Sequence, residues 1–181
     1  DKFADGVKVA AEKIGKDSNK FAAHIKGLEV TGYDLRCSKT AALAFATSYS
    51  GADNDNYSFN IHNKTNSHKD SSKCVAETTD IDAIVNSLIV CEYSKNVFQK
   101  EYAEIANLYN LVTGDELTPE DLKQTSERIN VLIRLINFRE GMSRKDDILP
   151  WKVMNIPIPD EGPAKGKVVT QQELNILLDE Y

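Results

Sequence analysis

The stretch that decides the fold class is TPEDLKQTSERINVLIRLINFR, residues 118–139. Thr118 supplies a capping hydroxyl, and Pro119 occupies the first helical position, where its missing N–H is not needed. Two carboxylates follow in the first turn, at the positive end of the helix dipole. Apolar residues then recur at helical spacing: Ile129, Leu132, Ile133 and Ile136. The stretch predicts a helix that runs to about Arg139 and ends at Gly141.

Helical patterns of this kind recur along most of the chain, and no convincing series of strands interrupts them. The predicted helices are residues 5–15, stopped by Gly15; a short helix through Phe21 and Ile25 that ends at Gly27; residues 39–49, capped by Ser38; a helix that begins at Thr79 or Asp80 and continues to Cys91; a helix through Phe98 and Val112, stopped by Gly114; and a helix after the Thr170–Glu173 capping box. Residues 28–35 and 149–166 are expected to be extended or irregular, because glycine or proline punctuates them. The sequence predicts a mostly α fold.

Residues 53–73 break the helical pattern with a long polar stretch. His62 and His68 lie in it, with Asp70 nearby, and could bind a metal opportunistically. No rigid element fixes their geometry, so an exposed excursion is the simpler interpretation. We expect one helical region over residues 1–181, in which a boundary between two helical layers could lie within this excursion.

The composition is that of an acidic, soluble, globular protein. The chain has 181 residues, with 22 Lys+Arg against 28 Asp+Glu and a formal net charge of −6. This balance argues against broad nucleic-acid binding, which needs a basic face. No apolar run is long enough to span a membrane. Three cysteines without a CxxC pair are a poor basis for disulfides or a zinc site, and they favour a reducing cytoplasm.

General catalytic motifs are missing from the sequence, which contains neither GxGxxG, a phosphate loop, GxSxG nor HExxH. Cys91 continues the apolar stripe of Ile84 and Leu88, so residue chemistry favours a buried structural cysteine. Asp146 and Asp147 follow two basic residues, which predicts a solvated loop with local ion pairs. Residue chemistry alone assigns no reaction.

A series of short strings nevertheless occurs in a specific order. The strings are KGLE (26–29), GYDLR (32–36), ALAFATS (42–48), GA (51–52), ERI (127–129), FREG (138–141), RKDDILP (144–150) and GP (162–163). Any one string would be weak, but the ordered set covers essentially the whole chain. It resembles the C-terminal helical half of the tungsten-containing aldehyde ferredoxin oxidoreductase family.

The resemblance implies an architecture and an activity. In that family an N-terminal β-rich domain and two helical domains enclose a bis-pterin tungsten or molybdenum centre beside a 4Fe–4S cluster. The enzyme oxidises an aldehyde to a carboxylic acid and passes electrons through the cluster to ferredoxin. The chain would then be the all-α C-terminal part, with irregular multi-helix domains, and would lack the pterin-binding β domain. The implied partners are ferredoxin, the aldehyde and that missing domain, and the chain could also form a homo-oligomer.

The family's cluster ligands set the expectation for the cysteines. Three ligands sit in a closely spaced motif upstream, and the fourth ends a D-x-x-G-L-C motif in the helical half. Cys91, at the end of NSLIVC (residues 86–91), is the candidate for that fourth position, and Ile89 stands where the motif has Gly. One thiolate cannot hold a four-iron cluster, which needs four ligands. The chain alone is therefore expected to bind no cofactor and to be inactive.

Other positions depart from the family pattern. Asn86 replaces the pterin-binding Asp, and Val90 replaces the Leu before the cysteine. Ser50 replaces an Arg that meets the pterin phosphate region, and Asn54 replaces the proposed proton-donor His. Serine lacks the guanidinium fork that suits phosphate, and asparagine cannot shuttle a proton at neutral pH. We predict no catalytic residue, cofactor contacts at Asn86, Val90 and Ser50, and Cys91 as the metal ligand.

Two interpretations of these departures stay open. In the first, the parent protein is an active oxidoreductase with altered substrate handling or a changed proton path. In the second, it is a non-catalytic relative with a degenerate cofactor site, which acts as a binding or scaffold module.

Overall fold

The computed structural model describes residues 4–53, 67–91, 101–159 and 161–181. Helices dominate this part of the chain: α1 (Gly6–Ile14), α2 (Lys39–Thr47), α3 (His68–Ser87), α4 (Tyr102–Thr113), α5 (Pro119–Arg139), α6 (Trp151–Asn155) and α7 (Gln171–Glu180). The strands β1 (His24–Ile25) and β2 (Leu28–Glu29) form a small antiparallel hairpin in which Ile25 faces Leu28. Short 3₁₀ turns complete the described elements: η1 (Ser18–Lys20), η2 (Leu35–Cys37) and η5 (Arg144–Asp146). The predicted all-α fold is confirmed.

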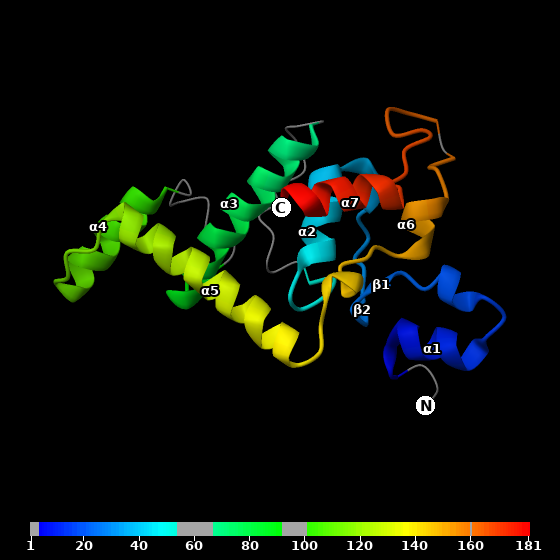
Figure 1. The fold of residues 1–181 in the computed structure, drawn as a ribbon, viewed down its shortest axis with the longest axis horizontal. Helices are drawn as coiled ribbons and strands as arrows, with labels where there is room; N and C mark the ends of the chain where they lie inside the picture. Colours follow the sequence, from blue (N-terminus) through cyan, green and yellow to red (C-terminus); the bar gives the residue numbers. More distant parts are fainter. Residues whose placement is uncertain (1–3, 54–66, 92–100, 160) are drawn as a thin grey trace.

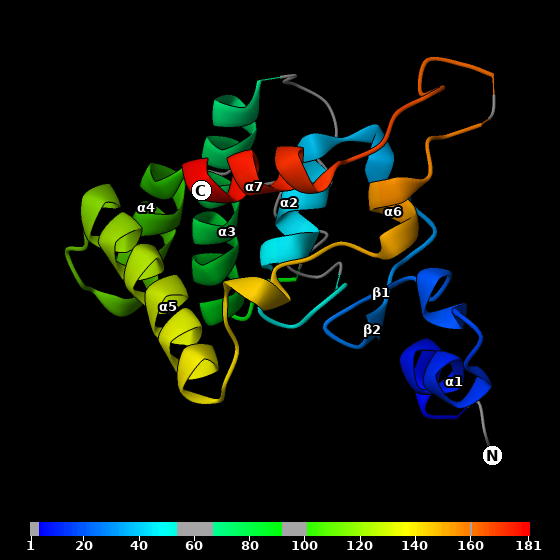
Figure 2. The same ribbon diagram turned by 45° about the vertical axis from the view of Figure 1, so that its right-hand side comes forward.

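Helix α3 is the centre of the arrangement. It packs against α2, α5 and α7, and α4 in turn packs against α5. In both ribbon views the α4–α5 hairpin lies at the opposite end of the molecule from α1 and the β-hairpin (Figures 1 and 2). The segment between α5 and α6 returns past the C-terminal end of α2, which brings distant parts of the sequence together there (Figure 1).

Two hydrophobic clusters share α3. The first is built on α2 and α7, and its largest fully buried members are Ile25, Leu35, Leu43, Val75, Val169, Leu174 and Leu177. The second lies between α3, α4 and α5 and consists of Ile84, Val85, Ile105, Ala106 and Leu122. The clusters therefore occupy the two ends of α3. The boundary predicted within residues 53–73 falls largely outside the described residues and stays a prediction.

Three of the predicted helix starts are confirmed by their caps, those of α2, α5 and α7. Thr118 caps α5: its hydroxyl accepts a hydrogen bond from the backbone N–H of Asp121 at 3.2 Å, and the Asp121 carboxylate accepts one from the Thr118 N–H at 2.8 Å. The Thr118 hydroxyl also donates to the Asp121 carboxylate at 2.6 Å, and this bond, together with the one from the Thr118 N–H, lowers the pKa of the Asp121 carboxyl. Thr170 and Glu173 form the same capping box at α7, and Ser38 caps α2.

The predicted short helix through Phe21 and Ile25 is wrong. The 3₁₀ turn η1 and the β-hairpin take its place. Lys26 and Gly27 both have positive φ values, 51° and 96°, which form the hairpin turn and are incompatible with a right-handed helix. The apolar spacing did not reveal that turn.

The predicted start of the next helix is also wrong. Helix α3 begins at His68, capped by Ser67, so the end of the expected polar excursion is helical. Apolar spacing does not mark this start, because the residues that the helix buries here are small and polar. Ser71 and Ser72 are both fully buried. The Ser72 hydroxyl donates to the Leu177 carbonyl at 2.8 Å, which ties α3 to α7.

The two histidines considered for metal binding are not brought together by the described structure. His62 lies outside the described residues, and His68 approaches the ammonium of Lys39 at 3.4 Å. Among the described residues, no helix combines the length and apolarity needed to cross a membrane.

Candidate functional site

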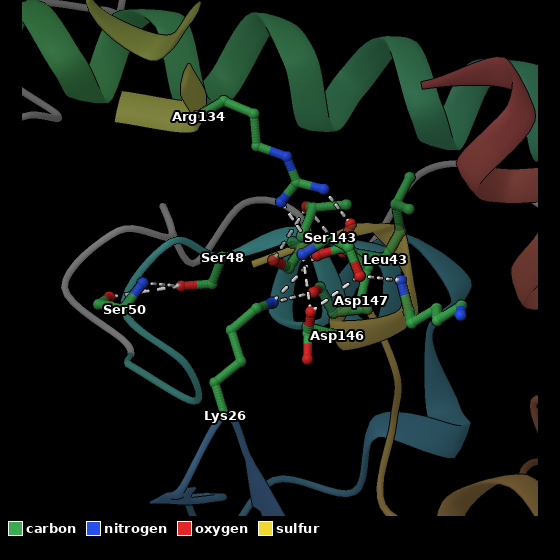
Figure 3. A network of polar contacts seen from close by, with 12 residues as sticks. Lys26, Leu43, Ser48, Ser50, Arg134, Ser143, Asp146 and Asp147 are labelled. Atoms are coloured by element: carbon green, nitrogen blue, oxygen red, sulfur yellow. Dashed lines mark hydrogen bonds and ion pairs between the residues drawn. The ribbon is translucent and has the colours of Figure 1, made fainter. Parts of the chain in front are cut away.

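A buried carboxylate, Asp147, joins three parts of the chain (Figure 3). Its Oδ1 lies 3.2 Å from the Lys26 ammonium and 3.1 Å from Nη1 of Arg134, and its Oδ2 bonds Nη2 of Arg134. Only 2% of the Asp147 side chain is exposed. The prediction that Asp147 lies in a solvated loop is therefore wrong. Its neighbour Asp146 does lie at the surface, where the backbone N–H and hydroxyl of Ser143 lower the pKa of its carboxyl.

Two cations compensate the buried charge of Asp147. Burial lowers the pKa of the Lys26 ammonium, and Asp147 acts in the opposite direction. The hydrogen bonds to Asp147 raise the pKa of the Arg134 guanidinium, which also lies over the ring of Phe138 at 5.1 Å. A carboxylate this deeply buried is tolerated only with such partners, so the three residues act as one unit.

The same unit supports the end of α2. The Lys26 ammonium donates to the carbonyl oxygen of Ala46 at 2.5 Å, close to the helix C-terminus. Gly51 packs so closely on the β-hairpin that an added Cβ would lie 2.5 Å from the Ile25 carbonyl oxygen. The hairpin thus contacts the chain on both sides of the turn that contains Ser48 and Ser50, at Ala46 before it and at Gly51 after it.

That turn contains Ser50, one of the predicted cofactor contacts. The Ser50 N–H donates to the hydroxyl of Ser48 at 3.3 Å (Figure 3). The Ser50 hydroxyl donates to the Asp53 carboxylate at 3.2 Å. Ser50 is exposed. It presents a neutral hydroxyl beside a carboxylate, which is a much weaker setting for a phosphate than a guanidinium would be. Asn54, the predicted proton-donor position, lies outside the described residues.

The predicted metal ligand Cys91 follows the C-terminus of α3. The Val90 N–H bonds the Val85 carbonyl at 3.1 Å, and the Ile89 N–H bonds the Asn86 carbonyl at 3.0 Å. These two bonds define a Schellman motif, in which the residue at C′ adopts a left-handed conformation. Ile89 occupies that position with φ 58°.

The left-handed conformation of Ile89 bears on the family motif. A β-branched residue pays a steric cost there that glycine does not, on the order of 1–2 kcal/mol. The family's D-x-x-G-L-C motif has Gly where this chain has Ile89. Glycine is the residue that a left-handed C′ position favours. The backbone therefore fits the register that places Cys91 at the motif's cysteine.

The three remaining predicted residues differ in their exposure. Asn86 and Cys91 are exposed, whereas Val90 is half-buried and packs against the α3–α4–α5 cluster. The expectation of a buried structural cysteine is therefore wrong. The helix ends at Ser87, so the apolar period that reached Leu88 does not extend to Cys91.

A pocket of about 850 Å³ lies between the end of α2, α3, α5 and α7. Ser48 and Asn86 both line it, so it connects the Ser50 turn to the end of α3. Its acidic lining residues are Asp80, Asp82, Glu127 and Asp147, and its basic ones are Arg134 and Arg144. Val90 and Cys91 are not lining residues. The pocket thus brings one predicted contact, Asn86, near the turn that carries another, Ser50.

On the acidic side of the pocket, carboxylates lie near one another and partly out of solvent. Burial raises the pKa of the Asp80 carboxyl, and Glu127 adds to the effect. The side-chain amide of Asn130 donates to Asp80 at 2.7 Å and opposes the rise. The basic side is largely engaged: Arg134 binds Asp147, and Arg144 binds Asp179 at 2.6 Å.

The residues fit the family's metal centres only in part. In the described ranges, no group of three or more His, Cys, Asp or Glu side chains could hold a metal ion. Cys91 is an exposed residue, and a cysteine is the usual ligand of a 4Fe–4S cluster, which needs four of them. Asn86 offers amide groups that can hydrogen-bond a pterin ring.

Sequence reasoning missed the unit of Lys26, Arg134 and Asp147. The contact joins residues that lie far apart in the chain, and no local pattern marks it. One signal was available: Lys26 and Asp147 lie in KGLE and RKDDILP, two of the strings that carry the family resemblance.

Comparison with known proteins identifies the class. The model of the family described as aldehyde ferredoxin oxidoreductase, domains 2 and 3, matches residues 1–181. The chain belongs to this family, and it is thus a relative of oxidoreductases.

Individual relatives agree with this assignment. The chain is 29% identical to the tungsten-containing aldehyde ferredoxin oxidoreductases of Pyrococcus furiosus and Thermococcus kodakarensis, over 96% of its own length in each case. It is 27% identical to the aliphatic sulfonate oxidoreductase, WOR-like subunit, of Pyrococcus furiosus, over 99% of its length. The chain spans only 30% of the length of the first two relatives and 28% of the third.

Proposed function

We propose that this chain forms the C-terminal helical part of a tungsten or molybdenum pterin aldehyde:ferredoxin oxidoreductase. The reaction converts an aldehyde and water to a carboxylic acid, and releases two electrons and two protons. In the complete enzyme a pterin-bound metal would supply two-electron redox chemistry, and a 4Fe–4S cluster would supply one-electron transfer toward ferredoxin. The family membership of the whole chain supports this proposal.

The observation that carries the proposal is the exposed position of Cys91, just after the end of α3. The Schellman turn directs the chain away from the helix after Ile89, so that Cys91 leaves the hydrophobic core. A buried thiol could not reach a cluster held by three ligands from elsewhere, whereas an exposed one can. In this proposal Cys91 is the fourth cluster ligand, and the other three belong to residues outside this chain.

The same arrangement supports the proposed pterin contacts. Asn86 lines the pocket and supplies hydrogen bonds without the negative charge of the family's Asp. Val90 holds the end of α3 against the core, and Ser50 offers a hydroxyl from the supported turn. Because Asn54 cannot transfer a proton at neutral pH, proton release would depend on another group of the complete enzyme.

The test is elemental analysis of the parent protein, purified anaerobically in full length. We expect about one tungsten or molybdenum and about four irons per chain, the content of one pterin centre and one 4Fe–4S cluster. A protein that lacks all three metals would contradict the proposal. It would instead favour the non-catalytic relative, in which Ser50, Asn54 and Asn86 reflect a lost cofactor site.

A further inference from the structure

Asp80, on α3, is a carboxylate in the pocket wall whose surroundings differ from those of an ordinary surface acid. It lines the pocket and is half-buried. Its carboxylate accepts a hydrogen bond from the side-chain amide of Asn130, a neutral donor, at 2.7 Å. Burial raises the pKa of the Asp80 carboxyl, which brings it closer to neutral pH. A half-buried carboxyl of this kind in a pocket is suited to proton transfer.

The groups around Asp80 favour a carboxyl that can hold a proton. The titratable groups that interact with it electrostatically are Glu77 on its own helix, Tyr102 on α4, Lys123 and Glu127 on α5, and Tyr181 after α7. Glu127 and Glu77 raise the pKa of Asp80, and Lys123 lowers it. Lys123 also lies 4.0 Å from the carboxylate of Glu127, so it does not serve Asp80 alone. Tyr49, which follows α2, is a further titratable residue of the pocket wall.

The other carboxylates of the pocket wall are less suited to take up a proton and release it again. Asp147 is bound to two cations, Lys26 and Arg134, which stabilise its charged form. Asp82 is only 3% exposed, so it exchanges protons with water poorly. Glu127 is exposed as well as lining the pocket, so it can pass a proton from the pocket to solvent.

We propose that the Asp80 carboxylate accepts, one after the other, the two protons released in the oxidation of the aldehyde, and that Glu127 passes each of them to solvent. This inference rests on the proposed function, in which an aldehyde and water give a carboxylic acid, two electrons and two protons. In each transfer a carboxylate oxygen of Asp80 forms an O–H bond to the released proton, and that bond breaks when Glu127 takes the proton. The electrons leave through the redox groups named in the proposed function.

The position of Asp80 on α3 suits this role. Asn86, the proposed pterin contact, follows Asp80 by six positions on α3, which is about 9 Å of helix rise, and both residues line the pocket. The pocket volume of about 850 Å³ leaves room for a small aldehyde and for water between them. Asp80 would thus take up protons through water, as a general base can do. It would supply the proton acceptor that Asn54 cannot be.

The pH dependence of aldehyde oxidation by the full-length parent protein tests the proposal. Asp80→Asn keeps the size of the side chain but removes the proton acceptor. Glu77→Gln is the matched control, because Glu77 lies on the same helix and is not a lining residue of the pocket. The wild-type rate should fall as the pH drops through the pKa of Asp80, because a protonated carboxyl accepts no proton. We expect Asp80→Asn to lose this acid limb and about 10²-fold or more of kcat with little change in KM, and Glu77→Gln to keep the acid limb.

Infrared titration of the same proteins provides a readout that does not depend on activity. The C=O band of the protonated Asp80 carboxyl is identified by its absence from Asp80→Asn. Its midpoint should lie above the ordinary pKa of an aspartate and coincide with the midpoint of the acid limb. Asn130→Leu should move the acid limb to higher pH, because the amide of Asn130 lowers the pKa of Asp80. That shift tests the proposal even if Asp80→Asn does not fold, and an unshifted acid limb would contradict it.

Metal analysis of the wild type separates this proposal from the proposed function. A wild type without tungsten, molybdenum and iron would refute the proposed function, and the role of Asp80 with it. A wild type that holds the metals and oxidises aldehydes, together with an Asp80→Asn variant of equal rate and pH profile, would refute the role of Asp80 alone. Loss of the acid limb in Asp82→Asn instead of Asp80→Asn would also overturn the assignment.

Discussion

Asp147→Ala is expected to lower the free energy of unfolding by about 3–5 kcal/mol, the usual cost of removing one partner from a buried ion pair. The loss arises because the Lys26 ammonium, whose side chain is only 10% exposed, would keep its charge without its carboxylate. Arg134 would lose a two-pronged contact at the same time. Urea unfolding of the 181-residue chain, followed by circular dichroism, measures the difference.

The adjacent residue provides the control for this prediction. Asp146 is exposed, and its contacts are confined to the Ser143 turn. Asp146→Ala should therefore cost much less than Asp147→Ala. Similar losses for the two variants would mean that the Lys26–Asp147–Arg134 unit does not stabilise the fold.

Gly51→Ala is the second change with a large expected effect. The backbone of Gly51 has φ 93°, and an added Cβ would lie 2.5 Å from the Ile25 carbonyl oxygen and 3.2 Å from the Leu28 Cβ. A positive φ costs a non-glycine residue about 1–2 kcal/mol, and overpacking typically costs about 1–3 kcal/mol, so we expect a loss of about 2–5 kcal/mol. The same unfolding measurement applies.

Gly32→Ala is the matched control for Gly51→Ala. No atom lies within 4 Å of the Cβ that would be added at Gly32, and its backbone is not in the left-handed region. The substitution should be neutral or stabilise the chain slightly through the unfolded state, by about 0.4–1 kcal/mol. If Gly51→Ala were as stable as Gly32→Ala, the close contact between the turn and the β-hairpin would be refuted.

The fold was predictable where its signals are local. Thr118 and Ser38 specify helix starts through bonds to residues three positions away, and the structure contains both caps. The start of α3 was not predictable from apolar spacing, because Ser71 and Ser72 are buried through contacts with other helices. Helix periodicity also predicted an end for α3 at Cys91, whereas the helix ends at Ser87, because periodicity does not detect the left-handed turn at Ile89.

The candidate site was predictable only through the order of the family's strings, and the family that they indicated is confirmed. The burial of Asp147 depends on Lys26, more than a hundred positions earlier in the chain, and no local pattern reports such a contact. The roles assigned to Ser50, Val90 and Asn86 stay predictions, because each depends on groups outside this chain.

The measurement that tests the central claim most directly is the iron content of the Cys91→Ser variant in the full-length parent protein. Cys37→Ser is the matched control, since Cys37 is also exposed and no cluster role is proposed for it. The account predicts about four irons per chain in the wild type and in Cys37→Ser, and a clear loss of iron in Cys91→Ser. An iron content in Cys91→Ser equal to that of the wild type would contradict the assignment of Cys91 as a cluster ligand.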